Sequence, residues 1–271
     1  MASDELATGL KATKGIEFLT APTPNGIKVS ILLEELKEAY GKDYTWQSIN
    51  LYKSVQKEPW FIAVNPNGRI PAIVDHDKGG FAVFESLGIL LYLTRQYDPE
   101  HRFSFADPLD ISRSEQWLAW HHGGVGPMHG QANYFSRFAK EKIPFPIQRY
   151  AGEAERLYGV LDHHLEGRDY IVGEGRGKYS IADIANFGWA AFGLATGLEI
   201  ERFPNLVRWV TELEKRPAVQ RGIAVPYKTN LTHSAYKKKL EEEPETRKEF
   251  EGFVELITKA KEQYEYKYTS P

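Results

Sequence analysis

The chain has 271 residues, of which 42% are hydrophobic and 26% charged, and its formal net charge is −3. This composition is typical of a globular protein, and a near-neutral chain without a large basic block gives no electrostatic support for nucleic-acid binding. The sequence contains no cysteine, which excludes disulfide scaffolds, thiolate zinc sites and a cysteine nucleophile. Any thiol chemistry must therefore use a sulfur that arrives on a substrate.

The N-terminal segment MASDELATGLKATKG is polar and lacks the apolar core of a signal peptide. No apolar run approaches the roughly 18 residues that a membrane span needs. We therefore expect a soluble, cytoplasmic protein without a membrane partner, and the absence of cysteine is consistent with a reducing compartment. Residues 1–14 are expected to form a flexible leader.

Residues 15–97 are expected to form an α/β domain. The order strand–helix–strand at its start indicates a parallel strand pair with a crossover helix, and a later Gly-Gly pair indicates a hairpin. The elements that carry this prediction are the strand GIEFLT (15–20), the helix from Ile27 to Gly41, the strand YTWQSINL (44–51), the hairpin within 63–86 and the helix SLGILLYLTRQY (86–97).

The second half of the chain is expected to be helical. Residues 98–110 contain two prolines and few apolar residues, which is typical of an interdomain linker. Helical patterns follow in a long helix from Ile111 that bends near Gly123, and at 146–167, 180–197 and 203–219. We therefore predict a helical-bundle domain over residues 111–225.

Residues 226–271 have a different, highly charged character and are predicted to form a helical C-terminal extension. A run of three lysines at 237–239 is followed by three glutamates at 241–243, and apolar residues recur near helical spacing between Phe250 and Ile257. This pattern favours an extra solvated helix that packs on the body of the protein. A helix that docks a partner is the alternative.

The first candidate site is Thr23-Pro24-Asn25-Gly26, between a predicted strand and a helix N-terminus. Unpaired backbone N–H groups and a partial positive charge at that terminus would stabilise a bound thiolate. Thr23 could donate a hydroxyl hydrogen bond and Asn25 an amide hydrogen bond. The alternative is local, with Asn25 as a helix cap and Thr23 as a turn residue.

The second candidate is the segment Asn65–Pro71, NPNGRIP. If the Ile70–Pro71 peptide bond is cis, the N–H and C=O groups of Ile70 turn outward from the sheet. A peptide ligand could then pair with them as if it were an added strand. The alternative is an ordinary β-turn.

The third candidate is Phe84-Glu85-Ser86, at the start of a predicted helix. Glu85 could accept a hydrogen bond from an ammonium group, while Ser86 and its backbone N–H could bind a carboxylate. The end group of an α-amino acid needs both contacts. Simple helix capping by Ser86 is the alternative.

The order of TPNG, NPNGRIPAI and FESLGILLYL resembles the glutathione-site motifs of the glutathione transferase superfamily. The similarity is greater to bacterial Nu-class transferases and to the transferase-like domain of the fungal nitrogen-catabolite regulator. It continues through WLAWHHGGVGPMHGQ, IQRYAGEAERLYGVLD, YSIADIANFGW and RFPNLVRWVTELEKRPAV, and so covers about residues 16–222. It implies a thioredoxin-like N-terminal domain, an all-α C-terminal domain and a homodimer.

The resemblance also implies roles for individual residues. Thr23 and Asn25 would face the sulfur of glutathione. The other implied glutathione contacts are Gln56 and Arg69 at the glycine carboxylate, Ile70 at the cysteinyl backbone, and Glu85 and Ser86 at the γ-glutamyl end. Ser180 and Asp183 would form a helix-capping box, which is a folding device.

We therefore expect a glutathione-dependent enzyme with glutathione as co-substrate. Two chemistries are open: conjugation to an electrophile, and disulfide reduction or glutathione-thioether cleavage. Without cysteine, exchange needs a second glutathione, and Arg149 could bind its carboxylate. A surface salt bridge is the other role open to Arg149, and Arg137 is the competing cation. We favour disulfide reduction and deglutathionylation, and a non-catalytic binding or regulatory module on the same fold is the alternative.

The acceptor pocket is expected to be lined by the helical domain. Its candidate residues are Asn133, Tyr134, Phe135 and Trp189. Several histidines could suggest a metal, but their spacing fits no zinc motif, so we expect no metal site. These histidines are His121, His122, His129, His163 and His164.

Overall fold

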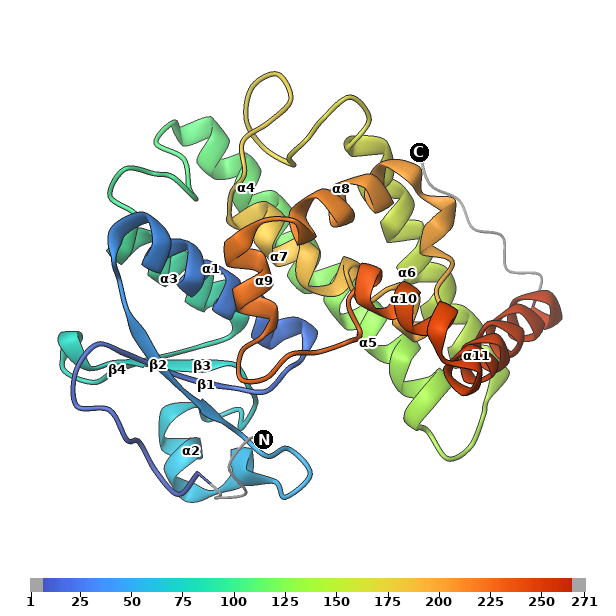
Figure 1. Cartoon of the computed structure of the whole chain (residues 1–271), viewed down its shortest axis with the longest axis horizontal. Helices are drawn as coiled ribbons and strands as arrows, with labels where there is room; N and C mark the ends of the chain where they lie inside the picture. Colours follow the sequence, from blue (N-terminus) through green and yellow to red (C-terminus); the bar gives the residue numbers. More distant parts are fainter. Residues whose placement is uncertain (1–6, 265–271) are drawn as a thin grey trace. The chain divides into compact units, whose positions relative to one another are not determined.

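The computed structural model describes residues 7–264 of the chain (Figure 1). Its contacts divide the chain into two compact units, Met1–Pro108 with Lys215–Thr229, and Leu109–Glu214 with Asn230–Pro271. These units differ from the domain boundaries expected from sequence in one main respect. The segment 215–229 belongs to the first unit by its contacts, although its sequence reads as a continuation of the helical domain.

The first unit contains a four-stranded sheet in the order β2-β1-β3-β4. β1 is parallel to β2 and antiparallel to β3, and β3 is antiparallel to β4, so the predicted parallel pair, the hairpin and the thioredoxin-like fold are confirmed. The elements of this unit are β1 (Ile16–Thr20), α1 (Pro24–Tyr40), β2 (Tyr44–Ser48), η1 (Val55–Lys57), α2 (Pro59–Val64), β3 (Ala72–Asp75), η2 (His76–Lys78), β4 (Phe81–Phe84), α3 (Ser86–Tyr97) and α9 (Pro217–Ile223).

Helix α9 packs against α1, which explains why the segment 215–229 joins this unit (Figure 1). The approach is close, since a Cβ atom on Gly222 would lie 2.7 Å from the Cα atom of Ile31. Ser30 donates to the carbonyl oxygen of Gly222 at 2.7 Å, and Arg216 binds Glu35 with a shortest distance of 3.0 Å. Such long-range contacts leave no local signal in a sequence pattern.

The described part of the N-terminal leader, residues 7–14, is held on the sheet rather than loose, which corrects the expected flexible leader there. Glu17 in β1 accepts from the backbone N–H groups of Lys11 at 2.8 Å and Ala12 at 3.2 Å. The Gln47 amide donates to the carbonyl oxygen of Gly9 at 2.9 Å. Ala7 lies in the hydrophobic cluster formed with Leu19, Ile49, Val55 and Phe61. Residues 1–6 lie outside the described part.

The second unit is helical, as predicted. Its elements are α4 (Pro108–Trp120), the π-helical turn η3 (His121–Val125), α5 (Gly126–Asn133), the π-helical turn η4 (Tyr134–Phe138), α6 (Pro144–His164), α7 (Ile181–Ala190), η5 (Leu194–Thr196), η6 (Ile200–Arg202), α8 (Pro204–Glu214), α10 (His233–Glu242) and α11 (Pro244–Gln263). Near Gly123, where a bend was expected, the chain forms the π-helical turn η3. The helix expected over 180–197 ends at Ala190, because the chain tightens into 3₁₀ turns that stop at Gly197 with φ 78°.

Helix α7 begins with the predicted capping box of Ser180 and Asp183, which is confirmed. Asp183 is fully buried and also accepts from the backbone N–H of Ile171 at 2.9 Å and from the indole N–H of Trp209 at 3.2 Å. Burial raises the pKa of Asp183 to about 7, although these hydrogen bonds oppose the shift. The residue therefore joins α7, α8 and the loop that precedes α7.

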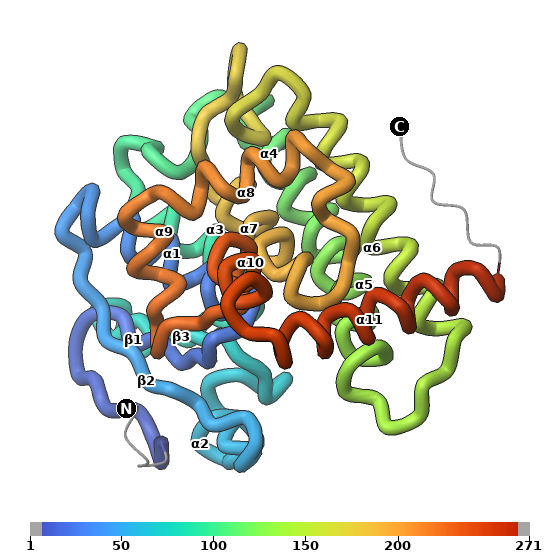
Figure 2. Tube along the Cα trace, turned by 45° about the vertical axis from the view of Figure 1, so that its right-hand side comes forward, coloured from blue at the N-terminus to red at the C-terminus, as the bar shows by residue number. Residues whose placement is uncertain are grey.

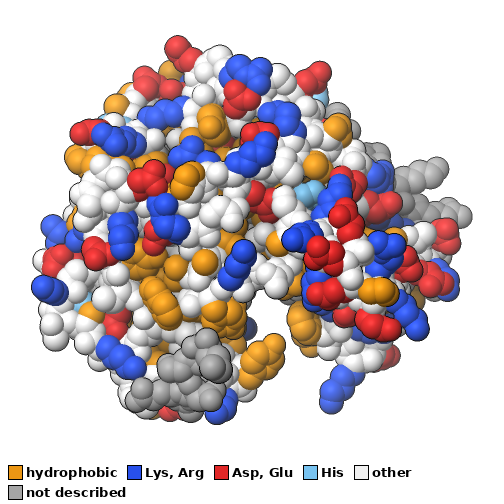
Figure 3. Space-filling model, in the orientation of Figure 1, with side chains coloured by type: hydrophobic (Ala, Val, Ile, Leu, Met, Phe, Trp, Pro, Cys, Tyr) orange, Lys and Arg blue, Asp and Glu red, His pale blue; other side chains and the backbone are white. Residues whose placement is uncertain are grey.

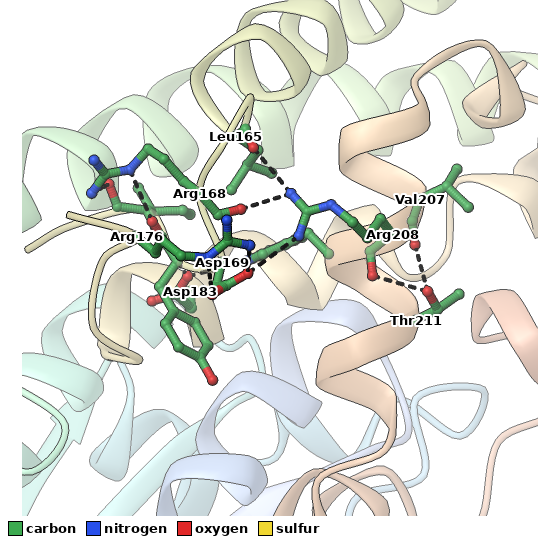
Figure 4. A network of polar contacts seen from close by, with 11 residues as sticks. Leu165, Arg168, Asp169, Arg176, Asp183, Val207, Arg208 and Thr211 are labelled. Carbon is green, nitrogen blue, oxygen red and sulfur yellow. Dashed lines mark hydrogen bonds and ion pairs between the residues drawn. The ribbon is translucent and has the colours of Figure 1, made fainter.

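Arginine side chains hold the loop between α6 and α7 (Figure 4). Arg208 of α8 donates to the carbonyl oxygens of Leu165 at 3.0 Å and Arg168 at 2.6 Å. Within the loop, Arg176 forms a two-bond ion pair with Asp169, at 2.7 and 2.5 Å. These contacts fix the loop to α8 and to itself.

The C-terminal extension forms two helices, α10 and α11, and α11 packs against α6 (Figure 2). Lys261 of α11 binds the fully buried Glu155 of α6 with distances of 2.6 and 2.7 Å. The Cβ atom of Phe253 lies 3.1 Å from where a Cβ on Gly197 would be. Figure 3 shows acidic and basic side chains interleaved over the face that these helices form. No helix among residues 7–264 is long and apolar enough to cross a membrane.

Candidate functional site

Strand register brings the three sequence motifs to one edge of the sheet in the first unit. Leu19, near the end of β1, pairs with Ala72 at the start of β3, and Ala72 pairs with Phe84 at the end of β4. The chain leaves β1 toward Thr23, enters β3 from Pro71 and leaves β4 at Glu85. The three motifs, at residues 23–26, 65–71 and 84–86, therefore follow one another along this edge.

The N-terminus of α1 lies at this edge with its backbone N–H groups directed outward. Thr23 is the N-cap and its hydroxyl oxygen accepts from the N–H of Gly26 at 3.1 Å, so the cap is Thr23 and not Asn25. The hydroxyl proton of Thr23 stays available for donation. Gly26 allows a close approach, since a Cβ there would lie 2.3 Å from the carbonyl oxygen of Ala21.

Asn25 lies in the first turn of α1, and its side-chain oxygen accepts from the ammonium group of Lys28 at 2.8 Å. The sequence analysis did not identify Lys28, which is 2% exposed. Burial lowers the pKa of Lys28 to about 7, while the negative charge of Glu85 opposes the shift. No signal in the sequence indicated this burial, because a lysine in an amphipathic helix normally lies on the solvated face.

The segment Asn65–Pro71 forms a tight turn that presents Ile70. The Asn65 side chain accepts from the N–H of Asn67 at 2.9 Å and donates to the carbonyl oxygen of Arg69 at 2.7 Å. The Ile70–Pro71 bond is cis, as the sequence analysis considered. Among residues 7–264, no hydrogen bond involves the N–H or C=O of Ile70.

Gln56 lies against this turn. Gly68 has φ 59°, and a Cβ on it would be 2.9 Å from the Gln56 carbonyl oxygen. The side-chain oxygen of Gln56 is buried and has no partner among the described residues. Arg69, the residue after Gly68, is exposed.

Glu85 and Ser86 open α3. Glu85 has φ 65°, a left-handed conformation that side chains other than glycine rarely adopt. Such strain is characteristic of binding sites, where the surrounding structure maintains it. Asn67 donates to the Glu85 carboxylate at 3.4 Å, which joins the second and third motifs. Ser86 is buried at the first position of the helix, beside the unpaired N–H groups of that terminus.

Arg149 and Arg137 lie in the second unit. Arg149, on α6, is 50% exposed and lies 3.6 Å from the carboxylate of Glu153, one turn later. This is the surface ion pair that the sequence analysis gave as the alternative role. Arg137 donates to the carbonyl oxygen of Ala195 at 2.9 Å and lies over the Phe253 ring. Arg137 therefore contacts the C-terminal extension.

The four residues predicted for the acceptor pocket also lie in the second unit. Phe135 stacks on Tyr150 with ring centroids 5.6 Å apart, and Tyr134 is 53% exposed. Trp189 packs on α5, because Cβ atoms on Gly126 and Gly130 would lie 3.2 and 3.4 Å from its ring. The side-chain oxygen of Asn133 is buried without a partner among the described residues. Gly126, Gly130 and Asn133 share one face of the helix by their spacing.

The histidines are structural where the contacts define them. The ring nitrogens of His129 lie 2.7 Å from the Tyr158 hydroxyl and 2.6 Å from the Thr196 hydroxyl, and burial lowers the pKa of His129 to about 3. His164 binds the carbonyl oxygen of Ile171 at 2.7 Å. Within residues 7–264, no group of three His, Asp or Glu side chains is arranged to hold a metal ion.

Two family models match the chain. Residues 24–96 match the glutathione S-transferase N-terminal domain, and residues 134–217 match the glutathione S-transferase C-terminal domain. The disulfide-bond oxidoreductase YfcG of Escherichia coli (strain K12) is 37% identical over 212 residues, which cover 77% of this chain and 94% of that protein. Both domains of this chain are therefore represented in the match.

Two solved structures extend the similarity to the fold. A glutathione transferase homologue from Lodderomyces elongisporus, with two glutathione molecules per subunit, has 41% identity and a TM-score of 0.73, and the match covers 79% of this chain and 99% of that one. A glutathione transferase from Pseudomonas putida, with one glutathione disulfide per subunit, has 36% identity and a TM-score of 0.73, with 80% and 94% covered.

Proposed function

The chain belongs to the glutathione transferase family, and we propose that it is a glutathione-dependent transferase that reduces or deglutathionylates glutathione disulfides or glutathione thioethers. The observation that carries this proposal is the row of motifs along one sheet edge, set by the pairs Leu19–Ala72 and Ala72–Phe84. In the order that glutathione requires, this row presents hydrogen-bond donors for a thiolate, a backbone N–H and C=O without partners among residues 7–264, and a site for an amino-acid end group.

Each part of glutathione has a group of matching chemistry. Thr23 and Asn25 would donate to the cysteinyl sulfur, and the N–H and C=O of Ile70 would pair with the cysteinyl backbone. The remaining contacts that we propose are Gln56 and Arg69 with the glycine carboxylate, Glu85 with the ammonium group, and Ser86 with the γ-glutamyl carboxylate.

The absence of cysteine decides how a disulfide would be reduced. The thiolate of bound glutathione attacks the glutathione sulfur of a mixed disulfide. A bond forms between the two glutathione sulfurs while the original disulfide bond breaks, and the other thiol leaves as a thiolate that takes a proton from solvent. The product is glutathione disulfide. This step needs room for two glutathione moieties in one subunit. The Lodderomyces structure contains two glutathione molecules per subunit and the Pseudomonas putida structure contains glutathione disulfide, which supports the proposal.

Arg149 is the cation that we propose for a carboxylate of the second glutathione moiety. Among residues 7–264 its ion-pair partner is Glu153 at 3.6 Å, a distance and exposure at which an ion pair contributes little stability. The guanidinium can therefore exchange Glu153 for a ligand carboxylate at low free-energy cost. A two-bond contact to a carboxylate is the geometry that arginine favours.

Paired assays on wild type and Arg149→Ala test the proposed function. One assay measures reduction of a mixed disulfide of glutathione, and the other measures conjugation of glutathione to an aromatic halide. We expect wild type to reduce the disulfide faster, and the substitution to slow reduction more than conjugation. Faster conjugation, or equal loss in both assays, contradicts the proposal. Glutathione binding without turnover in either assay would identify a non-catalytic module.

We also propose a homodimer that acts in the cytoplasm, with a detoxifying role against disulfides or electrophiles. Closed two-fold dimers are the most common assembly of soluble enzymes. Phe81 and Phe84 on β4 are exposed apolar side chains in the described part of the chain, at 54% and 39%, and a partner subunit would cover such groups. Light scattering at micromolar concentration tests the dimer, and a monomeric mass contradicts it.

A further inference from the structure

Ser30 is a fully buried polar residue in the second turn of α1, one turn after Gly26. A serine inside a helix ordinarily donates to a carbonyl oxygen of its own helix, three or four residues earlier. Here those oxygens are the more distant ones, at 3.2 Å on Ile27 and 3.5 Å on Gly26. The carbonyl oxygen of Gly222 in α9 lies 2.7 Å away. A hydroxyl has one proton, so we assign that proton to the bond with Gly222.

The carbonyl oxygen of Gly222 accepts this bond at a place where its own helix ends. In an α-helix it would accept from the N–H of the residue four positions later, but that residue is Pro226, which has no N–H. Among residues 7–264, the other donor to this oxygen is the N–H of Val225 at 3.2 Å. Ser30 therefore supplies the shorter of the two hydrogen bonds that this end of α9 receives.

Helices α1 and α9 are in direct backbone contact at this point (Figure 2). A Cβ atom on Gly222 would lie 2.7 Å from the N, Cα and Cγ1 atoms of Ile31, which is closer than such atoms can pack. Two ion pairs join the same helices further along α1, Glu34 with Arg221 at 2.7 Å and Glu35 with Arg216 at 3.0 Å. The second turn of α1 is therefore held in its distance from α9 and in its position along the helix axis.

The first turn of α1, which carries the proposed thiol site, is connected directly to this second turn. Ser30 follows Gly26 by four residues, which places both residues on one side of the helix. On that side the first turn contacts the end of β1, since a Cβ on Gly26 would lie 2.3 Å from the carbonyl oxygen of Ala21. Backbone hydrogen bonds in a helix join residues four apart. A displacement at Ser30 is therefore transmitted to the turn that begins at Thr23.

We propose that Ser30 is a positioning residue for the thiol: through its hydrogen bond to Gly222, it fixes the first turn of α1 where the N–H groups of that turn and the Thr23 hydroxyl stabilise the glutathione thiolate. This inference rests on the proposed function, because it requires a thiolate at that turn. The side chain of Ser30 is fully buried, so it acts through the helix and not by contact with the ligand. Helix α9 is thereby part of what builds the thiol site.

The test is Ser30→Ala, which removes the hydroxyl with almost no change in size. Thiolate absorbance across pH gives the pKa of the bound glutathione thiol, and calorimetry below that pKa gives the glutathione Kd. We expect a thiol pKa higher by about half a unit to one unit, which is up to about a tenfold smaller thiolate fraction. We expect a kcat for disulfide reduction about tenfold lower, because a displacement of about 1 Å costs about 100-fold and this one is smaller. The Kd should not change, because the other proposed glutathione contacts lie outside α1.

Gly222→Ala breaks the same contact from the other helix without changing Ser30. Its Cβ would force α9 away from Ile31, so the hydroxyl loses its acceptor, and we expect the same changes in thiol pKa and kcat. The double variant Ser30→Ala with Gly222→Ala should raise the thiol pKa no further than Gly222→Ala alone, because both substitutions remove one contact. Additive shifts in thiol pKa would overturn the inference. If Gly222→Ala does not fold, Ser30→Ala decides the question alone.

Thr94→Ala is the matched control for the loss of a buried hydroxyl in the same unit. Thr94, on α3, is 6% exposed and donates within its own helix, to the carbonyl oxygens of Leu90 at 3.0 Å and Leu91 at 3.2 Å. This variant should be less stable in urea, with the thiol pKa and kcat of wild type. The same behaviour in Ser30→Ala refutes the positioning role alone. Wild-type protein that binds no glutathione refutes the proposed function and this inference with it.

Discussion

The ion pair between Glu155 and Lys261 predicts that the C-terminal extension stabilises the helical unit. Glu155 is fully buried on α6, and both of its oxygens accept from the Lys261 ammonium group, at 2.6 and 2.7 Å. Lys261 itself is 16% exposed at its side chain. Substitution of Lys261 by Met therefore leaves a carboxylate in the interior without its main partner.

The size of the effect follows from what remains around Glu155. Removal of one partner of a buried pair destabilises a fold by about 3–5 kcal/mol. The guanidinium of Arg202 lies 3.9 Å from Glu155 and is 48% exposed, so it compensates in part. We expect Lys261→Met to lower the free energy of unfolding by about 3 kcal/mol, the lower end of that range.

Urea unfolding followed by tryptophan fluorescence measures this change. Lys259→Met is the matched control, because Lys259 lies two residues away, is 70% exposed and pairs with Glu255 on the surface; it should lower stability by less than about 1 kcal/mol. The double variant Lys261→Met with Glu155→Met removes both charges and should recover most of the loss. Equal effects of Lys261→Met and Lys259→Met would refute the reasoning.

Three further predictions follow from single carboxylates. Glu85→Gln should weaken glutathione binding about 10- to 100-fold by calorimetry, because the ligand ammonium group loses a charged acceptor worth about 1.5–3 kcal/mol; unchanged affinity contradicts the role. Burial raises the pKa of Glu17, but its hydrogen bonds hold the net pKa below the usual value of about 4.5. The stabilisation of the fold by ionised Glu17 is therefore present above the unfolded pKa, and it is lost as the pH falls through the lower, folded pKa. Acid unfolding of Glu17→Gln should lack that loss. Asp183→Ala should lower the free energy of unfolding by at least about 3 kcal/mol, because the donors of Ile171 and Trp209 lose their acceptor; a smaller change in urea unfolding argues against it.

The features that the sequence predicted are those with local chemical signals. Pro24 at the first turn of α1, Gly41 with φ 68° at its end, and the box of Ser180 and Asp183 are each specified by neighbours within a few residues. The glutathione motifs are of the same kind, since each one is a turn or a helix start. Their assembly at one sheet edge follows from strand order, which the crossover and the hairpin signals indicate.

The features that the sequence did not predict depend on contacts between distant segments. The packing of Gly222 on Ile31 has no signal in the sequence, which predicted one helix over 203–219, whereas the structure has α8 and α9 there. The burial of Lys28 is hidden for a similar reason, because a lysine in an amphipathic helix normally lies on the solvated face. The contact between Glu85 and Asn67, eighteen residues earlier, is another contact of this kind.

Gly26 gives the most direct test of how finely the thiol site is placed. A Cβ at Gly26 would lie 2.3 Å from the carbonyl oxygen of Ala21 and 2.6 Å from the Thr20 hydroxyl, so in Gly26→Ala the first turn of α1 has to move away from β1. A displacement of about 1 Å at a reacting group reduces catalysis by about 100-fold, and we expect a loss of that order in kcat/KM for disulfide reduction. Gly88→Ala is the control, because Gly88 lies within α3 with no atom within 4 Å of its added Cβ; it should raise stability by about 0.5–1 kcal/mol and leave turnover unchanged. Wild-type turnover in Gly26→Ala would show that the start of α1 does not position the thiol, and would contradict the site proposed for glutathione.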